Sequence, residues 1–148
     1  MKLAIGSDHA GLIIKNMLRD MLVGEGHDVH DFGASSEIAS DYPDYAALVG
    51  KAVAAGEAEL GVLVCGTGAG MAIAANKVKG VRAAAASEDV TARMTRSHND
   101  ANVICIGQRI VGPEVAAEIV HTFLSTPFSH SERHELRLAK VNGLEIGD

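Results

Sequence analysis

One stretch of the sequence decides the fold: Val62-Leu63-Val64-Cys65-Gly66-Thr67-Gly68-Ala69-Gly70-Met71-Ala72-Ile73-Ala74-Ala75-Asn76-Lys77. The β-branched and leucine residues from Leu60 to Val64 predict a buried strand. The alanine-rich segment after Gly70 predicts a helix that stops near Gly80, because Ala and Met are good helix formers. Between the two lies a turn that is almost free of side chains.

The last strand position, Cys65, is the first candidate for chemistry. The backbone N–H groups of a glycine-rich turn can point at a small anion, helped by the partial positive charge of a helix N-terminus. A thiol in that setting is expected to ionise more readily than a free one. The hypothesis is a base beside an oxyanion hole. The alternative is a buried small hydrophobe next to a turn that only permits close packing, which is how we interpret Cys105.

Composition limits the classes of function. The chain has 148 residues, of which 47% are hydrophobic and 22% charged, which predicts a globular domain with a real core. Its net charge of -6 argues against nonspecific binding to nucleic acid or membranes. Aromatic residues make up only 3%, so no stacking platform for bases or sugars is expected.

Two cysteines in or next to strands do not form a disulfide framework, and this fits a reducing compartment. The apolar start of the chain is too short for a signal peptide, and no run approaches the length that crosses a bilayer. We therefore expect a cytoplasmic protein with neither a membrane nor a nucleic acid as partner.

Strands and helices alternate along the chain roughly every 25 residues. Strands are predicted at 3–5, 28–32 (a polar strand, suited to an edge), 60–64, 81–86 and 103–106. Helices are predicted to end at 24–26, 55–56, 80, 98–100 and 124, with a last helix after Ser131. This alternation favours right-handed crossovers and a five-stranded parallel sheet. The fold prediction is one three-layer α/β/α Rossmann-like domain over residues 1–148, with an additional C-terminal helix.

Ligands of such sheets bind outside the carboxyl ends of the strands. The unusual polar residues that follow strands are Asp8, His9, Cys65, Thr67, Ser87, Gln108 and Arg109. His98 and Asn99 lie before the fifth strand, at the opposite end of the sheet. They would fit a site of a neighbouring subunit.

Several of these residues also have a purely structural interpretation. Asp8 is a suitable N-cap, and the segment His98–Asp100 is a suitable polar helix end. Arg133 and Arg137 are four residues apart, so both could grip one phosphate or simply form a solvated basic face. The histidines show no metal-ligand spacing, so no metal is expected.

Seven segments together give the chain its resemblance to a known family. It resembles the sugar-phosphate isomerases that include ribose-5-phosphate isomerase B and the galactose-6-phosphate and allose-6-phosphate isomerases. The matching segments are 6–11, 41–43, 65–70, 74–77, 98–102, 107–109 and 133–137. They span nearly the whole chain in the family's order, and together they are highly specific.

The resemblance implies a catalytic role for Cys65 as the base that moves a proton between C1 and C2 of the open-chain sugar. The backbone of Gly66, Gly68, Ala69 and Gly70 would hold the enediolate oxygen, and Thr67 and Asp8 would bind the reacting end. Another branch of the family has a glutamate where this chain has Met71, so the cysteine branch applies.

By the same resemblance, His98 would open the sugar ring and Asn99 would bind a hydroxyl. His9, Arg109, Arg133 and Arg137 would bind the phosphate. Family members are homodimers or homotetramers whose sites draw on two subunits, and no cofactor is implied.

The chemistry of these residues agrees with that role. Aldose–ketose isomerisation needs either a metal for hydride shift or a base with an oxyanion site, and the Cys65 turn supplies the second. The expected reaction interconverts D-ribose 5-phosphate and D-ribulose 5-phosphate. Allose 6-phosphate, galactose 6-phosphate and a tetrulose phosphate remain alternative substrates.

Parts of the pattern also suit two other classes of protein. A dinucleotide-binding module would use Glu88 as a ribose-binding acid, but the glycines run G-x-G-x-G and follow a central strand far from the N-terminus. A cysteine-dependent phosphatase would need an arginine six positions after Cys65, where the chain has Met71. The phosphatase is rejected.

Overall fold

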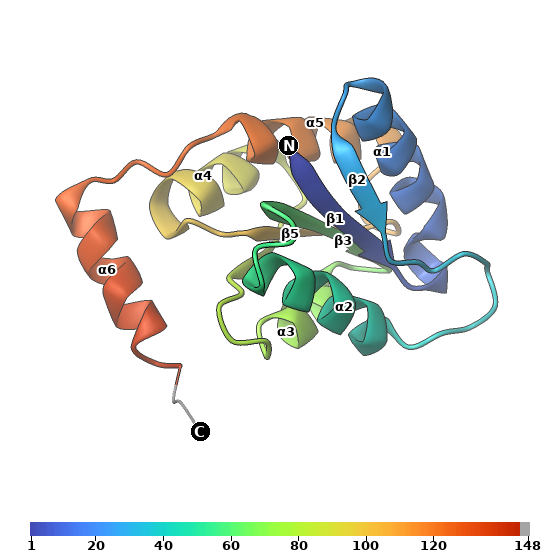
Figure 1. Cartoon of the computed structure of the whole chain (residues 1–148). Coiled ribbons are helices and arrows are strands. Elements are labelled where there is room, and N and C mark those ends of the chain that lie inside the picture. The colour runs from blue at the N-terminus through green and yellow to red at the C-terminus, as the bar shows by residue number, and fades with distance from the viewer. Residues whose placement is uncertain (146–148) are drawn as a thin grey trace.

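The structure describes residues 1–145 in a computed structural model, and these residues form five parallel strands between layers of helices (Figure 1). The strands are β1 (Lys2–Ser7), β2 (Asp28–Asp31), β3 (Leu60–Cys65), β4 (Ala83–Ala85) and β5 (Val103–Gly107). The helices are the 3₁₀ turn η1 (His9–Gly11), α1 (Leu12–Gly24), α2 (Tyr42–Ala54), α3 (Ala69–Ala75), α4 (Asp89–Asn99), α5 (Pro113–Ser125) and α6 (Glu132–Asn142). The predicted three-layer α/β/α fold is confirmed.

The sheet has the strand order β2-β1-β3-β5-β4, which places the polar strand β2 at an edge as predicted. All six residues of the central strand β3 are buried. In the register of the sheet, Ser7 lies beside Val64, and Cys65 lies beside Gly107. The carboxyl ends of β1, β3 and β5 are therefore level, so the loops that follow them meet at one edge.

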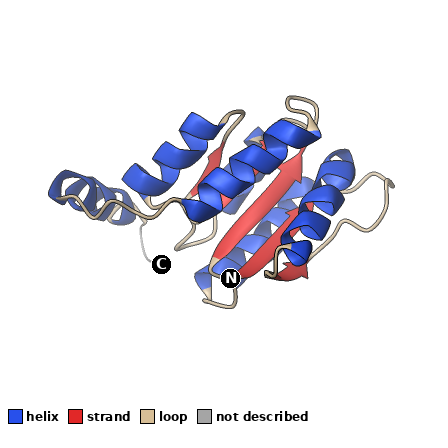
Figure 2. Cartoon of the chain, turned by 90° about the horizontal axis from the view of Figure 1, so that it is seen from above, coloured by secondary structure: helices blue, strands red, loops and turns tan. Residues whose placement is uncertain are grey.

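Alternation along β3 divides the core between the two faces of the sheet. Val62 and Val64 point toward the layer of α1, α4 and α5, where Phe123 is fully buried. Leu63 and Cys65 point toward the opposite layer, formed by α2 and α3. Figure 1 shows the first layer above the sheet and the second below it, and Figure 2 looks down on the first.

Two predicted boundaries were wrong near Asn76. The helix α3 ends at Ala75 and does not continue toward Gly80, and β4 is limited to three residues. The Asn76 side chain accepts from the Ala83 amide (2.8 Å) and donates to the Ala83 carbonyl (2.9 Å). This side chain satisfies backbone groups that a longer helix or strand would have paired, so it ends one element and anchors the next.

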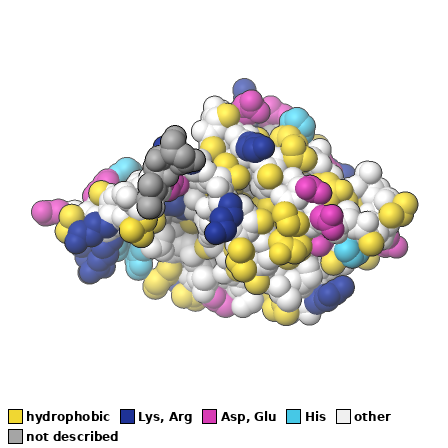
Figure 3. Space-filling view, turned by 90° about the horizontal axis from the view of Figure 1, so that it is seen from below, with side chains coloured by type: hydrophobic (Ala, Val, Ile, Leu, Met, Phe, Trp, Pro, Cys, Tyr) yellow, Lys and Arg dark blue, Asp and Glu magenta, His cyan; other side chains and the backbone are white. Residues whose placement is uncertain are grey.

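The last helix, α6, lies beyond α4, at the side of the molecule away from α1 (Figures 1 and 2). It packs against α4, and His134 is its one buried residue. Exposed hydrophobic side chains are found on the α2–α3 face, where Figure 3 shows many yellow side chains; they include Tyr42, Leu48 and Ile73. Over residues 1–145, no helix combines the length and hydrophobicity needed to cross a bilayer.

Candidate active site

The Cys65 thiol ends β3 and points into the α2–α3 core, with only 4% of the residue exposed. The Gly68 amide donates a hydrogen bond to its sulfur, over 3.2 Å. Cys65 is the last residue of the strand, as predicted, but strand alternation turns its side chain inward with Leu63. The expected N–H donor at the sulfur is present.

The turn after Cys65 packs tightly against the end of β5. Gly68 has φ +82°, a left-handed conformation that favours glycine, and a Cβ there would lie 3.1 Å from the Ile106 backbone. A Cβ on Gly107 would lie 2.6 Å from the backbone of Thr67. Larger residues at either position would push the turn off the sheet, so these glycines fix where the Gly68 amide points.

Two side chains lie over the outer face of the same turn. The Arg109 guanidinium is 3.2 Å from the position that a Cβ on Gly66 would occupy, and the Tyr42 ring is 3.0 Å from the corresponding position at Gly70. Thr67 is exposed between them, and its hydroxyl accepts from the Ala69 amide at 3.3 Å. The turn that follows Cys65 therefore carries a phenol, a guanidinium and a hydroxyl around its glycines.

The Arg109 loop is attached to the turn through its backbone. The Gln108 amide donates to the Cys65 carbonyl (2.8 Å), and the Arg109 amide donates to the Gly66 carbonyl (3.0 Å). The Gln108 side chain accepts from the Ile14 amide in the first turn of α1 (2.9 Å). Gln108 therefore satisfies one of the unpaired N–H groups of a helix start while holding Arg109 beside the glycines.

Asp8 follows β1 and is buried beside this turn, with 6% exposure. Its Oδ1 atom accepts from the amides of Ala10 (3.0 Å) and Gly11 (3.1 Å), so the N-cap interpretation is confirmed for η1. Gly11 lets η1 approach β3, since a Cβ there would lie 2.4 Å from the Val64 carbonyl oxygen. This contact brings Asp8 and Cys65 to the same edge.

His9 connects that edge to the loop before α2. Its amide donates to the Ser40 hydroxyl (3.2 Å), and its Nδ1 accepts from the Ser40 amide (3.1 Å). Because Nδ1 is an acceptor here, the neutral ring carries its proton on Nε2. That N–H is the group that His9 can offer to a ligand.

A buried lysine, Lys15, fixes the segment beside Asp8 and was not predicted from the sequence. It is 1% exposed, and its Nζ donates to both oxygens of Asp31 (3.0 and 2.8 Å) and to the Ala34 carbonyl (2.8 Å). Two backbone bonds then join Gly33 and Ala34 to Ser7, at 2.6 and 2.7 Å. The ion pair therefore ties the loop after β2 to the end of β1.

His98 and Asn99 end α4 and lie at the other end of the sheet, as the sequence indicated. The register places Val103 beside Gly61, four residues before Cys65 along β3. At a strand rise of about 3.3 Å per residue, the two ends are separated by roughly 13 Å along the sheet. A single chain does not bring His98 to Cys65.

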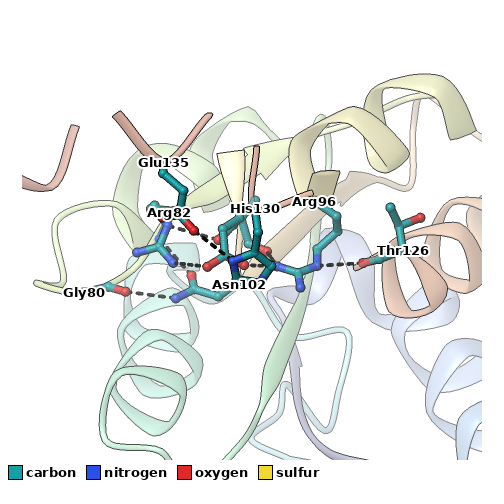
Figure 4. A network of polar contacts seen from close by, with 9 residues as sticks. Gly80, Arg82, Arg96, Asn102, Thr126, His130 and Glu135 are labelled. Atoms are coloured by element: carbon teal, nitrogen blue, oxygen red, sulfur yellow. Dashed lines mark hydrogen bonds and ion pairs between the residues drawn. The ribbon is translucent and has the colours of Figure 1, made fainter. Parts of the chain in front are cut away.

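A polar network holds the end of α4 (Figure 4). Asp100 has φ +45°, and it accepts from Arg96 (2.7 Å) and Arg82 (3.3 Å). The Asn102 side chain bonds the Arg82 amide (2.8 Å) and the Gly80 carbonyl (2.9 Å). Asp100 and Asn102 therefore have structural partners, and they shape the helix end that presents His98. The polar helix-end interpretation of this segment is confirmed.

A groove of about 620 Å³ lies between α4, α6 and β4. Its lining includes His98, Asn99, His134 and Arg137 but no residue of the Cys65 turn. Arg133 and Arg137 are exposed on α6, and their charges act on His134. The predicted site residues thus form two groups, and Cys65, Thr67, Asp8, His9 and Arg109 belong to the first.

Tyr42 and His134 were not assigned roles from the sequence. Tyr42 belongs to a matching segment, but its position over Gly70 depends on how α2 packs against α3. His134 belongs to an apolar stripe with Leu138 and Val141, four and seven residues later. That spacing was the available signal that His134 points inward.

Comparison with known proteins gives the family. Residues 3–141 match the family model described as Ribose/Galactose Isomerase. The chain belongs to this family. It is 44% identical to ribose-5-phosphate isomerase B of Escherichia coli over 144 residues, which are 97% of this chain and 96% of that one.

Structural comparison agrees with the family match. The solved structure of Clostridium thermocellum ribose-5-phosphate isomerase B matches with a TM-score of 0.96 and 45% identity, covering 98% of this chain and 97% of that one. D-erythrulose-4-phosphate isomerase of Pectobacterium atrosepticum is 40% identical, covering 86% and 85% of the two chains. The chain is therefore an aldose–ketose isomerase of the sugar-phosphate class.

The structure also bears on the dinucleotide rival. Glu88, the candidate ribose-binding acid, accepts from the Thr91 amide (2.9 Å) as the N-cap of α4. Hydrogen bonds from Thr91 lower the pKa of Glu88. Its carboxylate therefore caps a helix at the site where the rival needed a ribose ligand. Within residues 1–145, no three His, Cys, Asp or Glu side chains gather as metal ligands.

Proposed function

We propose that this enzyme interconverts D-ribose 5-phosphate and D-ribulose 5-phosphate. The observation that carries the proposal is the Cys65 sulfur held 3.2 Å from the Gly68 amide, where the ends of β1, β3 and β5 are level. Ligands of open parallel sheets bind at that edge. The E. coli relative, named ribose-5-phosphate isomerase B, supports the choice of sugar.

The proposed chemistry is proton transfer through a cis-enediolate. The Cys65 thiolate takes the proton from C2 of the open-chain aldose, and the carbonyl electrons move to O1. Backbone N–H groups of Gly66–Gly70 stabilise the resulting oxyanion. The thiol then returns a proton to C1, while Thr67 transfers the hydroxyl proton from O2 to O1, since its hydroxyl both donates and accepts. Asp8 orients the hydroxyls at the reacting end.

Access to the sulfur is part of the proposal, because Cys65 is only 4% exposed. Tyr42 and Arg109, which lie against the turn after Cys65, are exposed side chains, so they can move without disturbing the sheet. Alkylation by iodoacetamide tests this point. Inactivation should be slowed by ribose 5-phosphate, and the label should be on Cys65; a label on neither cysteine would show that the thiol is out of reach.

Ring opening is assigned to His98 of a second copy of the chain, with Asn99 binding a sugar hydroxyl. A homodimer or homotetramer would bring the α4–α6 groove of one copy over the Cys65 edge of another. The exposed hydrophobic residues Tyr42, Leu48 and Ile73 offer apolar surface for such an assembly.

Binding of the substrate phosphate is assigned to four residues: His9, Arg109, Arg133 and Arg137. His9 would donate its Nε2–H, and the three guanidiniums would supply charge in a chain whose net charge is -6. Binding energy at the phosphate helps to orient C1 and C2 against the thiolate. Two free cysteines among residues 1–145 fit the cytoplasm as the compartment that we propose.

A shorter sugar is the second candidate, because the Pectobacterium relative is named for a tetrulose phosphate. A panel of purified aldose and ketose phosphates of four, five and six carbons tests the proposal, assayed without added metal. The account predicts the largest kcat/KM for the ribose 5-phosphate pair. A larger value for erythrulose 4-phosphate, allose 6-phosphate or galactose 6-phosphate would reassign the substrate.

A further inference from the structure

His134 is the one side chain that α6 buries, with 6% exposure. Its imidazole lies against that of His98 on α4, with ring centroids 4.3 Å apart and planes tilted by 32°. A buried polar ring on an otherwise exposed helix costs free energy unless it is paired. The contact therefore needs an explanation beyond the packing of α6.

The ring of His134 is fixed from its other side by Ser129. The Ser129 hydroxyl and Nδ1 of His134 are 2.5 Å apart. The Ser129 amide also donates to the carbonyl of Ser97, the residue before His98, over 3.0 Å. One serine thus holds both the ring of His134 and the backbone that carries His98, so the two imidazoles are fixed relative to each other.

The charges around this pair are mainly positive. Arg133 and Arg137 of α6 act on His134, Arg82 lines the same groove from the side of β4, and Glu145 is the acidic group of the lining. Burial lowers the pKa of His134, and the charges of His98, Arg133 and Arg137 lower it further. A lowered pKa favours the neutral imidazole of His134, so the ring can lie against His98 without adding a charge to the contact.

We propose that His134, clamped by Ser129, is a positioning residue that orients the His98 ring for opening of the sugar ring. This inference rests on the proposed function. In that step His98 takes the proton of the anomeric hydroxyl O1, the bond between C1 and O4 breaks, and O4 receives the proton. The imidazole must face both oxygens in turn, so its orientation limits this step alone.

The test compares two substrates that differ in one atom. Ribose 5-phosphate closes to a furanose through O4, whereas its 4-deoxy analogue lacks that hydroxyl and stays open. His134→Ala should lower kcat on ribose 5-phosphate by roughly ten- to a hundredfold and leave kcat on the analogue within about twofold. Ser129→Ala should show the same split with a smaller loss, and it keeps the proposal testable if His134→Ala unfolds.

His121→Ala is the matched control, because His121 is an exposed histidine of α5 that pairs with Glu25. It should change neither rate. Equal losses on both substrates, or no loss on either, would overturn the positioning role.

NMR of the imidazole C–H signals gives a readout that does not depend on activity. The His98 signals should move in His134→Ala and stay in place in His121→Ala; unmoved His98 signals in both would reject the contact. If the wild-type enzyme turns over neither sugar, the proposed substrate fails, and the NMR result still decides whether His134 orients His98.

Discussion

The Cys65 edge of the sheet and the groove between α4 and α6 are built in opposite ways. At the edge, glycines bring backbone against backbone, and Cys65 is buried, with 4% of the residue exposed. At the groove, side chains from an outlying helix face about 620 Å³ of open space. The first is packed within one chain, whereas the second is an open groove in which His98 lies against His134.

This difference matches the demands of the two proposed steps. Removing a proton from carbon needs an oxyanion site that does not reorganise, which backbone amides packed on a sheet provide. Ring opening needs an acid–base group within reach of both O1 and O4, and the proposed group is His98 of a second copy. Separating the steps between two surfaces lets assembly of two copies complete the site.

The largest effect is expected from a substitution at the Cys65 edge of the sheet. Cys65→Ala should lower kcat by on the order of 10³–10⁴-fold on both ribose 5-phosphate and its open-chain 4-deoxy analogue, because the base is lost in either case. Cys105→Ala is the matched control: burial raises the pKa of Cys105, so that thiol stays protonated and inert. Steady-state assays should find Cys105→Ala active, and activity in Cys65→Ala would assign the base elsewhere.

The next largest effect is expected on the stability of the fold, at the ion pair that holds the segment beside Asp8. Lys15→Ala leaves the Asp31 carboxylate without its buried partner and should cost about 3–5 kcal/mol in the free energy of unfolding. Urea unfolding measures it. Lys15→Met combined with Asp31→Asn removes both charges and should cost clearly less. A loss below about 1 kcal/mol for Lys15→Ala would mean that the ion pair between Lys15 and Asp31 does not stabilise the fold.

The same ion pair predicts a pH dependence. Burial would raise the pKa of Asp31, but hydrogen bonds from Lys15, the Gly33 amide and Arg19 outweigh it and lower the pKa. A carboxyl group that is more acidic when folded stabilises the fold above its unfolded pKa, and this contribution is lost as the pH falls through the folded value. Asp31→Asn should therefore flatten the acid side of the stability curve; an unchanged slope would contradict the assignment.

A smaller and selective loss of kcat is expected from a substitution in the groove between α4 and α6. His98→Ala should lower kcat on ribose 5-phosphate by roughly a hundredfold, while the open-chain analogue should be affected little. Comparing the two substrates in one assay sharpens the contrast with Cys65→Ala. Equal losses on both would place His98 in the proton transfer at carbon instead.

The smallest effect is expected from the arginines of α6. Arg133→Ala with Arg137→Ala should raise KM for ribose 5-phosphate by roughly tenfold with little change in kcat, since both side chains are exposed and their proposed role is to bind the phosphate far from the reacting carbons. Arg93→Ala, an exposed residue of α4 that faces Asp89, is the control. An unchanged KM would remove the α6 arginines from the phosphate role.

Most of the fold could be predicted from the sequence because its signals are local. Hydrophobic runs at 60–64 and 103–106 predict the central strands, and Pro113 begins α5 where proline suits a helix start. The boundaries near Asn76 could not be predicted, because its side chain bonds Ala83, seven residues away. Lys15 lies on the buried face of α1 only because Asp31, distant in sequence, neutralises it.

The sequence predicted which polar residues follow the strands but not how their side chains are arranged. Strand order and register place Asp8 beside Cys65, and the glycine-rich turn predicts the oxyanion donors. The Cys65 side chain points inward because it lies on the same face of β3 as the buried Leu63. This alternation is present in the sequence, but the glycine-rich turn directly after Cys65 drew the interpretation toward an accessible thiol. The contact between His134 and His98 joins two helices, so nothing local in the sequence indicates it.

The central claim is that a complete site takes Cys65 from one copy and His98 from another. Coexpression of Cys65→Ala and His98→Ala chains with different tags, followed by purification of mixed dimers, tests it directly. Each mixed dimer would contain one site with both residues intact, so its activity on ribose 5-phosphate should return to about half that of the wild-type dimer. Mixed dimers of wild-type chains with the Cys65→Ala, His98→Ala double variant should have two broken sites and little activity. Inactive first dimers together with half-active second dimers would show that the site lies within one chain, and would contradict the account.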